Sequence, residues 1–221
     1  MTARNALLAV TGVTKRFGSD VAIDSVRFEV ERGERFCLVG HNGAGKSTLL
    51  RLIAGLSYPS EGTISVLGGD PAREPSVRRR IGYLSDQPHL YDKLTGGEHL
   101  RLHAALYGLS PEEASVRSEG LLEDLGLNPC PRVERLSFGT RKKLALVLAL
   151  VHEPDLLVLD EPTNGLDPAS AEVVEDLLRR HVGAVVLSTH SLEFAAAFAS
   201  EIGVMRNGRI TSRGVRRGDD G

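Results

Sequence analysis

Residues 40–48 carry a glycine-rich pattern that is suited to holding phosphate groups. They read Gly-His-Asn-Gly-Ala-Gly-Lys-Ser-Thr, a glycine, four residues, then glycine, lysine and a hydroxyl residue. An apolar run at residues 36–39 precedes this loop, and residues 48–53 follow it with helical spacing. The loop therefore joins a buried strand to a helix N-terminus, where free backbone N–H groups attract anions.

Each part of this loop has a chemical role toward a triphosphate. Glycines let the backbone pass close to the oxygens because no Cβ stands in the way. Lys46 supplies a positive charge between the β- and γ-phosphates, and the Ser47 hydroxyl is a ligand for Mg2+. The residues predicted to hold the nucleotide here are Gly40, Asn42, Gly43, Ala44, Gly45, Lys46, Ser47 and Thr48.

Two adjacent acids follow a second apolar run. Residues 156–159 are all apolar, as in a parallel strand buried on both faces, and they lead directly into Asp160 and Glu161. Asp160, at the end of that strand, is predicted to be a ligand of Mg2+. Glu161 points elsewhere because side chains alternate along a strand, so we expect it to act as a base toward the attacking water.

A histidine ends the next apolar run. Residues 184–187 lead into Ser188, Thr189 and His190. Taken singly, a histidine in this place is more often a capping or surface residue. Ligands bind at the carboxyl ends of parallel strands, however, and the spacing after Asp160 and Glu161 favours donation from His190 to a γ-phosphate oxygen.

These residues must be positioned by an α/β core. Residues 7–35 alternate in the manner of antiparallel strands, and helical spacing dominates from about residue 95 to residue 150. A helix at 171–180 lies between two apolar runs, which gives a strand–helix–strand unit. The pattern predicts an α/β core with an antiparallel addition near the front and a helical insertion in the middle.

Composition limits the function classes. With 27 basic and 29 acidic residues among 221, the net charge of −2 argues against a protein held to nucleic acid mainly by phosphate contacts. Two distant cysteines, Cys37 and Cys130, indicate no disulfide scaffold and favour a reducing cytoplasm. The longest apolar run, residues 144–151, is far shorter than the roughly 20 residues that a membrane span needs.

Taken together, the motifs and their order resemble the ATP-binding cassette ATPases, the nucleotide-binding subunits of ABC transporters, over residues 7–208. The resemblance implies a P-loop NTPase with a RecA-like core, an N-terminal antiparallel β subdomain and an inserted α-helical subdomain. It implies a single domain over 1–221: the core and β subdomain at about 1–87 and 152–213, the insertion at about 88–151, and a flexible tail at 214–221.

The resemblance also assigns roles that the residues alone do not. Ser137 and Gly139, within residues 136–140, take the place of the signature motif. Asp167 belongs to the segment called the D-loop, and Phe17 stands where an aromatic ring stacks on adenine. The family arrangement implies a head-to-tail dimer in which each ATP, with its Mg2+, touches the phosphate loop of one subunit and the signature motif of the other.

Two motifs depart from the family pattern. In the signature, usually Leu-Ser-Gly-Gly-Gln, Phe138 replaces the first glycine and Thr140 the glutamine, and the basic run 141–143 is expected to begin a helix. At the Q-loop, Asp86 stands where a glutamine is usual. We expect Asp86 to keep a role linked to Mg2+, with Gln87 as the alternative.

The leading functional hypothesis is an ATPase that powers a separate polytopic membrane permease. Residues 90–95 after the acidic Q-loop are similar to those of ABC-2 type exporters. The expected partners are that permease and a second, identical ATPase subunit, without nucleic acid. The expected location is the cytoplasmic face of the cell membrane. The alternatives are a soluble machine built on the same ATPase and a nucleotide sensor without transport.

Overall fold

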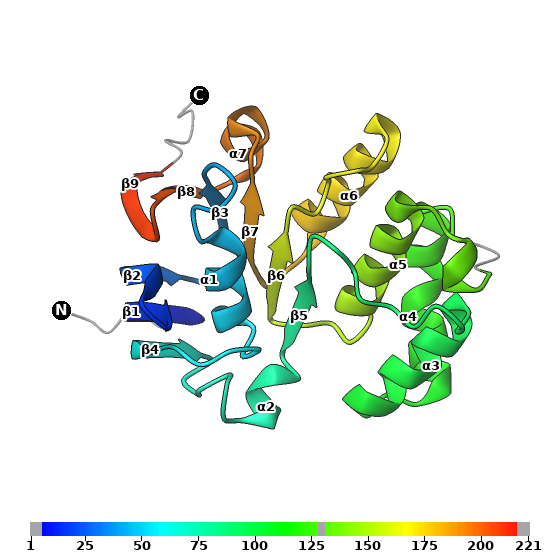
Figure 1. The fold of residues 1–221 in the computed structure, drawn as a ribbon. Coiled ribbons are helices and arrows are strands. Elements are labelled where there is room, and N and C mark those ends of the chain that lie inside the picture. The colour runs from blue at the N-terminus through cyan, green and yellow to red at the C-terminus, as the bar shows by residue number, and fades with distance from the viewer. Residues whose placement is uncertain (1–5, 128–130, 216–221) are drawn as a thin grey trace.

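Two β-sheets organise the chain in the computed structural model, which describes residues 6–127 and 131–215 (Figure 1). The smaller, antiparallel sheet has the order β2 (Asp20–Val30), β1 (Leu8–Phe17) and β4 (Glu61–Val66). The larger has the order β5 (Ile81–Leu84), β6 (Leu156–Asp160), β7 (Ala184–Thr189), β3 (Arg35–Val39), β8 (Glu201–Arg206) and β9 (Arg209–Val215). Its strands pair in parallel except for β8 with β9.

The helices fall into separate groups around these sheets. They are α1 (Lys46–Ile53), α2 (Pro75–Arg78), α3 (Gly96–Tyr107), α4 (Pro111–Asp124), α5 (Phe138–Leu150), α6 (Pro168–Arg180) and α7 (Leu192–Phe198), with a short 3-10 helix at Val133–Arg135. Figure 1 shows α3, α4 and α5 gathered at the side of the molecule opposite the antiparallel strands. Within the described residues, no helix combines the length and apolar character needed to cross a membrane.

The large sheet divides the apolar residues between two cores. On β3, Phe36 and Leu38 belong to the core that includes α1 and the antiparallel strands. Cys37 and Val39 alternate to the opposite core, which includes residues of α5, α6 and α7. The central strands are thus covered on both faces, as their continuous apolar runs predict, and the α/β fold is confirmed.

Local capping explains where the helices begin. Ser110 caps α4 in a capping box with Glu113, as the Ser-Pro-Glu-Glu sequence predicts. The prediction that a helix begins at residues 141–143 is wrong, because α5 begins at Phe138. The Ser137 hydroxyl accepts the N–H of Thr140 at 3.1 Å, so it satisfies a free donor and starts the helix three residues earlier.

Not every element was anticipated from the sequence. Strands β1 and β2 form the antiparallel hairpin that the alternation over residues 7–35 predicts, whereas the second hairpin, of β8 and β9, was not predicted. The predicted flexible tail at 214–221 is wrong for its first residues, because Gly214 pairs with Ile202 in that hairpin. The rest of the tail, residues 216–221, and Cys130 lie outside the described residues.

Two histidines and a tyrosine pack together between α3 and the end of α5. The Nε2 atom of His103 lies 3.3 Å from Nδ1 of His152, and the Tyr107 ring centroid lies 3.9 Å from that of His152. Burial lowers the pKa of His103 to about 4, and the neighbouring His152 acts in the same direction. Burial also lowers the pKa of His152, although its bond to the Ile81 carbonyl opposes the shift.

This cluster predicts a pH-dependent stability. The unfolded chain binds a proton at His103 near pH 6.5, whereas the folded chain binds it only near pH 4. The stabilisation is therefore present above pH 6.5 and is lost as pH falls toward 4, at up to about 1.4 kcal/mol per pH unit for one proton. The free energy of unfolding is measured in urea at several pH values between 4 and 6.5. His103→Gln should make this free energy depend less steeply on pH, whereas His41→Gln, at an exposed site, should leave the dependence unchanged. Equal slopes for wild type and His103→Gln would contradict the assignment.

Candidate functional site

A cleft of about 560 Å3 opens where β3 and β6 end. It is lined by Val21, Ala22, residues 41–48, Asp86, Asp160, Glu161, Asn207 and Gly208. Small-molecule sites commonly measure about 300–1,000 Å3, so the cleft is large enough for a nucleotide.

The glycine-rich loop follows β3 and ends at the N-terminus of α1. Gly45 is the N-cap of α1 with a φ of 104°, a conformation that side chains rarely adopt. A Cβ on Gly45 would lie 2.6 Å from the Ala22 carbonyl oxygen, and one on Gly40 would collide with the Met205 carbonyl. The Gly208 N–H donates to the Ala44 carbonyl at 3.0 Å. The loop therefore rests directly on the backbone of β2 and of the β8–β9 hairpin.

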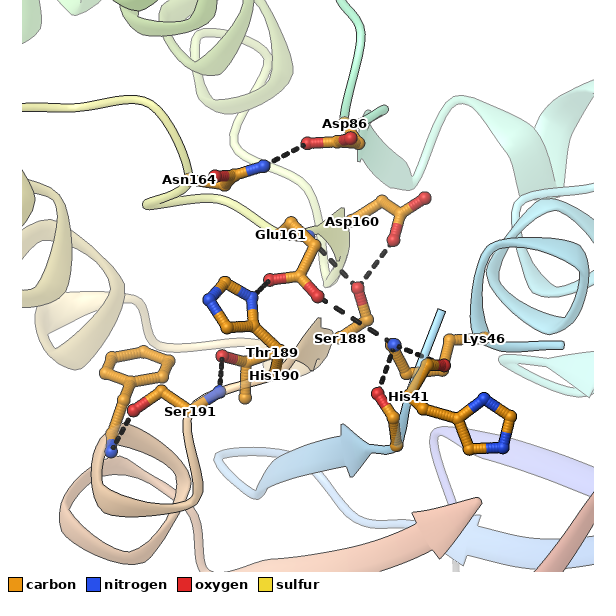
Figure 2. A network of polar contacts seen from close by, with 12 residues as sticks. His41, Lys46, Asp86, Asp160, Glu161, Asn164, Ser188, Thr189, His190 and Ser191 are labelled. Atoms are coloured by element: carbon orange, nitrogen blue, oxygen red, sulfur yellow. Dashed lines mark hydrogen bonds and ion pairs between the residues drawn. The ribbon is translucent and has the colours of Figure 1, made fainter. Parts of the chain in front are cut away.

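Lys46 connects the loop to the acidic side of the cleft. Its side chain is only 6% exposed, and its Nζ donates to the carbonyls of Gly40 at 2.6 Å and His41 at 3.3 Å. The same Nζ lies 3.9 Å from Oε1 of Glu161. Figure 2 shows this ammonium between the loop and the carboxylate.

Ser188 holds the two acids in place. The parallel register pairs Asp160 with Ser188, whose hydroxyl donates to Oδ1 of Asp160 at 2.5 Å. The same hydroxyl accepts the backbone N–H of Glu161 at 3.0 Å. Glu161 itself has a φ of 49°, so its backbone turns sharply out of the strand direction. Both acids line the cleft, although Asp160 is buried.

His190 completes the arrangement from the end of the next strand. Its Nδ1 lies 2.9 Å from Oε2 of Glu161, and its ring is otherwise well exposed. The Glu161 carboxylate therefore has Lys46 on one oxygen and His190 on the other (Figure 2). The three residues that the sequence predicts to be catalytic are brought together.

The sequence profile of the family described as ABC transporter matches residues 23–164 of this chain. The chain belongs to the ABC transporter family. It is 35% identical over 220 residues to the ABC transporter ATP-binding protein NatA of Bacillus subtilis, a match that covers 95% of this chain and 89% of that protein. It is 35% identical over 215 residues to the Nod factor export ATP-binding protein I of Ralstonia nicotianae. That match covers 94% of this chain and 67% of that protein.

A solved structure agrees with the sequence comparison. The ATP-binding cassette MJ0796, in a dimeric post-hydrolysis state bound to ADP and Pi, superposes with a TM-score of 0.87 at 27% identity. That match covers 96% of this chain and 99% of the other. The present chain is an ATP-binding subunit of the ABC type, and its activity is ATP hydrolysis.

One lysine of this ABC ATPase enters the site without having been predicted there. Lys142 on α5 is buried, and its Nζ lies 3.0 Å from Oδ1 of Asp86. In the sequence, Lys142 belongs to the basic run 141–143, which is predicted to begin a helix. A signal was nevertheless present, because Lys142 precedes the buried Leu146 and Ala149 by four and seven positions.

Asp86, rather than Gln87, lines the cleft. Its Oδ1 accepts from Lys142 and also from Nδ2 of Asn164 at 3.2 Å.

Four further residues line the cleft without having been predicted there: Val21, Ala22, Asn207 and Gly208. Asn207 and Gly208 form the turn of the β8–β9 hairpin, and an Asn-Gly pair between apolar segments is a recognisable hairpin signal. Nothing in the sequence distinguishes Val21 and Ala22.

Other residues predicted to contact the nucleotide lie outside the cleft lining. Phe17 is 58% exposed at the end of β1, and Lys15 Nζ lies 5.1 Å from its ring centroid. Ser137 is exposed at the start of α5, with Gly139 next to it. Asp167 caps α6 by accepting the Ser170 N–H at 3.0 Å, and bonds from Ser170 hold the pKa of Asp167 below its usual value.

The double role of Ser188 gives a test of how the acids are held. Ser188→Ala removes the donor to Asp160 and the acceptor of the Glu161 N–H, and an unsatisfied buried polar group costs about 1–3 kcal/mol. Loss of such a supporting contact typically lowers activity by about 10- to 100-fold. We expect both effects in urea unfolding and in steady-state ATP hydrolysis.

The neighbouring Thr189→Val is the matched control, because the Thr189 hydroxyl accepts from the Ser191 N–H and bonds neither acid. An ATPase rate for Ser188→Ala equal to that of Thr189→Val would show that Ser188 does not organise the acids.

Proposed function

We propose that this ABC ATPase binds ATP in the cleft and hydrolyses it with Glu161 as the general base. The observation that carries the proposal is the position of the Glu161 carboxylate. It lies 3.9 Å from Lys46 Nζ and 2.9 Å from His190 Nδ1, beside a glycine loop shaped for phosphates. A carboxylate so placed accepts a proton from a water that attacks the γ-phosphate.

The phosphates are held mainly by the loop. The N-terminus of α1, with its free backbone N–H groups, and the Lys46 ammonium present positive charge to the cleft. Within the loop, the Ala44 N–H donates to the His41 carbonyl at 3.2 Å. Because Lys46 is already bonded to Gly40 and His41, the loop keeps its shape before ATP arrives. His190 orients Glu161 through Nδ1, and it donates to a γ-phosphate oxygen at the same time only when its ring is protonated.

The donor set also fits Mg2+. The Ser47 hydroxyl and the Asp160 carboxylate line the same cleft, and Mg2+ in proteins is usually held by one or two carboxylates together with substrate phosphates. Held there, Mg2+ would supply positive charge to offset that of the phosphates. Asp86 is proposed as an outer contributor, since its Oδ1 is engaged by Lys142 and Asn164.

A second copy of the chain is proposed to close the cleft. Ser137 and Gly139 stand at the start of α5 and outside the cleft lining, so they reach ATP most simply from a partner subunit. The dimeric form of the similar cassette MJ0796 supports this arrangement. Asp167 is proposed to lie at the same interface, and Phe17 to stack on adenine.

The chain is proposed to be one ATPase domain, with residues 88–151 as its helical insertion, that powers an exporter. The similarity to a Nod factor export ATP-binding protein supports export. We propose a polytopic permease on a separate chain as the partner and a location at the cytoplasmic face of the membrane. The transported substrate is selected by that permease.

The base assignment is tested by Glu161→Gln, which keeps the side-chain shape and removes its basicity. Loss of a general base should lower the hydrolysis rate by about 100- to 10,000-fold while ATP still binds and holds the dimer. Single-turnover phosphate release and size-exclusion chromatography with Mg-ATP measure the two effects. Glu119→Gln, at an exposed site on α4, is the control. Hydrolysis by Glu161→Gln at the wild-type rate would rule out this base.

The adenine contact has its own test. Stacking of a base on an aromatic ring contributes about 1–3 kcal/mol, so Phe17→Ala should weaken ATP binding by roughly 5- to 150-fold. Phe17→Tyr keeps the ring face and should bind nearly as wild type does. Calorimetric titration with Mg-ATP compares the three proteins, and equal affinities would place adenine elsewhere.

A further inference from the structure

We propose that Lys142 is a positioning residue for ATP hydrolysis, whose ammonium fixes the backbone of Glu161 together with Asp86 and Asn164. The proposal rests on the proposed role of Glu161 as the base. It concerns a residue on α5 that does not line the cleft, so Lys142 acts through the groups it holds rather than on the nucleotide.

The geometry around Nζ of Lys142 matches a protonated amine. It lies 3.0 Å from Oδ1 of Asp86, 2.7 Å from the carbonyl oxygen of Glu161 and 3.0 Å from that of Asn164. Two of these partners are carbonyls that only accept, and the third is a carboxylate. An ammonium has three N–H donors, one for each oxygen, whereas a neutral amine has only two.

The burial of this lysine needs a reason. Lys142 is 1% exposed, and a charged group taken out of water is costly unless it is paired and hydrogen-bonded. Burial lowers the pKa of Lys142, and the bond and charge of Asp86 oppose that shift. The chain therefore maintains an expensive cation at a place where an apolar residue would fill the space.

What the cation holds is the strained turn that aims Glu161. Glu161 has a φ of 49°, in the left-handed region, which costs a residue other than glycine on the order of 1–3 kcal/mol. Its carbonyl is bonded by Lys142, and its N–H is bonded by Ser188 at 3.0 Å. With both backbone groups fixed, the carboxylate is directed between Lys46 and His190.

The same cation joins segments that are distant in sequence. Asp86 follows β5, Glu161 and Asn164 follow β6, and Lys142 lies one turn into α5. Nδ2 of Asn164 donates to Oδ1 of Asp86, which closes the cluster (Figure 2). Lys142 Nζ also lies 5.3 Å from the ring centroid of Phe138, next to the helix cap Ser137. Lys142 therefore links the start of α5 to the backbone of Glu161.

The test separates catalysis from binding and from stability. Lys142→Met keeps the length of the side chain and removes its donors, and Lys142→Gln keeps a neutral donor. We expect kcat for ATP hydrolysis to fall by about 10- to 100-fold, as for other supporting contacts, with little change in the affinity for Mg-ATP. The control is Lys143→Met, because Lys143 Nζ makes a long 3.5 Å contact with Ser170 Oγ and, among the described residues, bonds none of Asp86, Glu161 and Asn164.

Two measurements make the outcome decisive. Thermal unfolding monitors stability, and titration of Mg-ATP monitors binding in the same proteins. A Lys142→Met variant that loses thermal stability but keeps the wild-type kcat at a permissive temperature would overturn the positioning role. If Lys142→Met does not fold, Lys142→Gln decides by the same criterion.

Glu161→Gln is measured in parallel, so that failure of the proposed function is distinguishable. If Glu161→Gln hydrolyses ATP normally, the base assignment fails first, and the positioning role fails with it. If Glu161→Gln is inactive while both Lys142 variants keep the wild-type kcat, only the role of Lys142 is overturned. Loss of kcat in Glu161→Gln and in the Lys142 variants, with binding retained and Lys143→Met unaffected, supports both.

Discussion

Parallel pairing of neighbouring strands is the constraint on which the site depends. In the order β5, β6, β7, β3, all four strands end at the same edge of the sheet. Asp86, the two acids, His190 and the glycine loop follow these ends one after another along that edge. Lys46 and Glu161, which are more than a hundred residues apart in the chain, are thereby brought to 3.9 Å. A change of one residue in register would move every one of these side chains.

Two buried lysines contact Glu161, one at its side chain and the other at its backbone. Lys46 lies near the carboxylate of Glu161, and Lys142 bonds its carbonyl. Attraction between charges is much stronger away from water than at the surface, so each lysine acts strongly where it lies. Both ammonium groups are also bonded to backbone carbonyls. The charges therefore brace the loops around the cleft before any ligand enters.

The sequence predicted the parts of the site that are contiguous in the chain. The glycine loop, Asp160, Glu161 and His190 each adjoin an apolar run, so local pattern and strand geometry were enough to place them. For Lys142 two local signals conflict, because three charges together at 141–143 suggest a solvated surface, whereas the helical spacing to Leu146 and Ala149 favours a buried face. The burial of Lys142 follows from the packing of α5 against β5, which is a tertiary property. The predicted start of α5, at residues 141–143, is wrong for a local reason. Ser137 is predicted as a contact of ATP, but in the structure it also caps the helix, which therefore begins at Phe138.

The pairing of Asp86 with Lys142 also accounts for the departure at the Q-loop. The family resemblance places a neutral glutamine there, whereas this chain carries a carboxylate in the wall of the cleft. An unpaired carboxylate would repel a triphosphate, and repulsion between like charges is strong in a partly buried cleft. Lys142 at 3.0 Å supplies the balancing charge from the protein side, and Asn164 donates to the same oxygen. The cation that α5 brings to this carboxylate offsets its repulsion of an anionic ligand, which makes residue 86 and residue 142 a coupled pair.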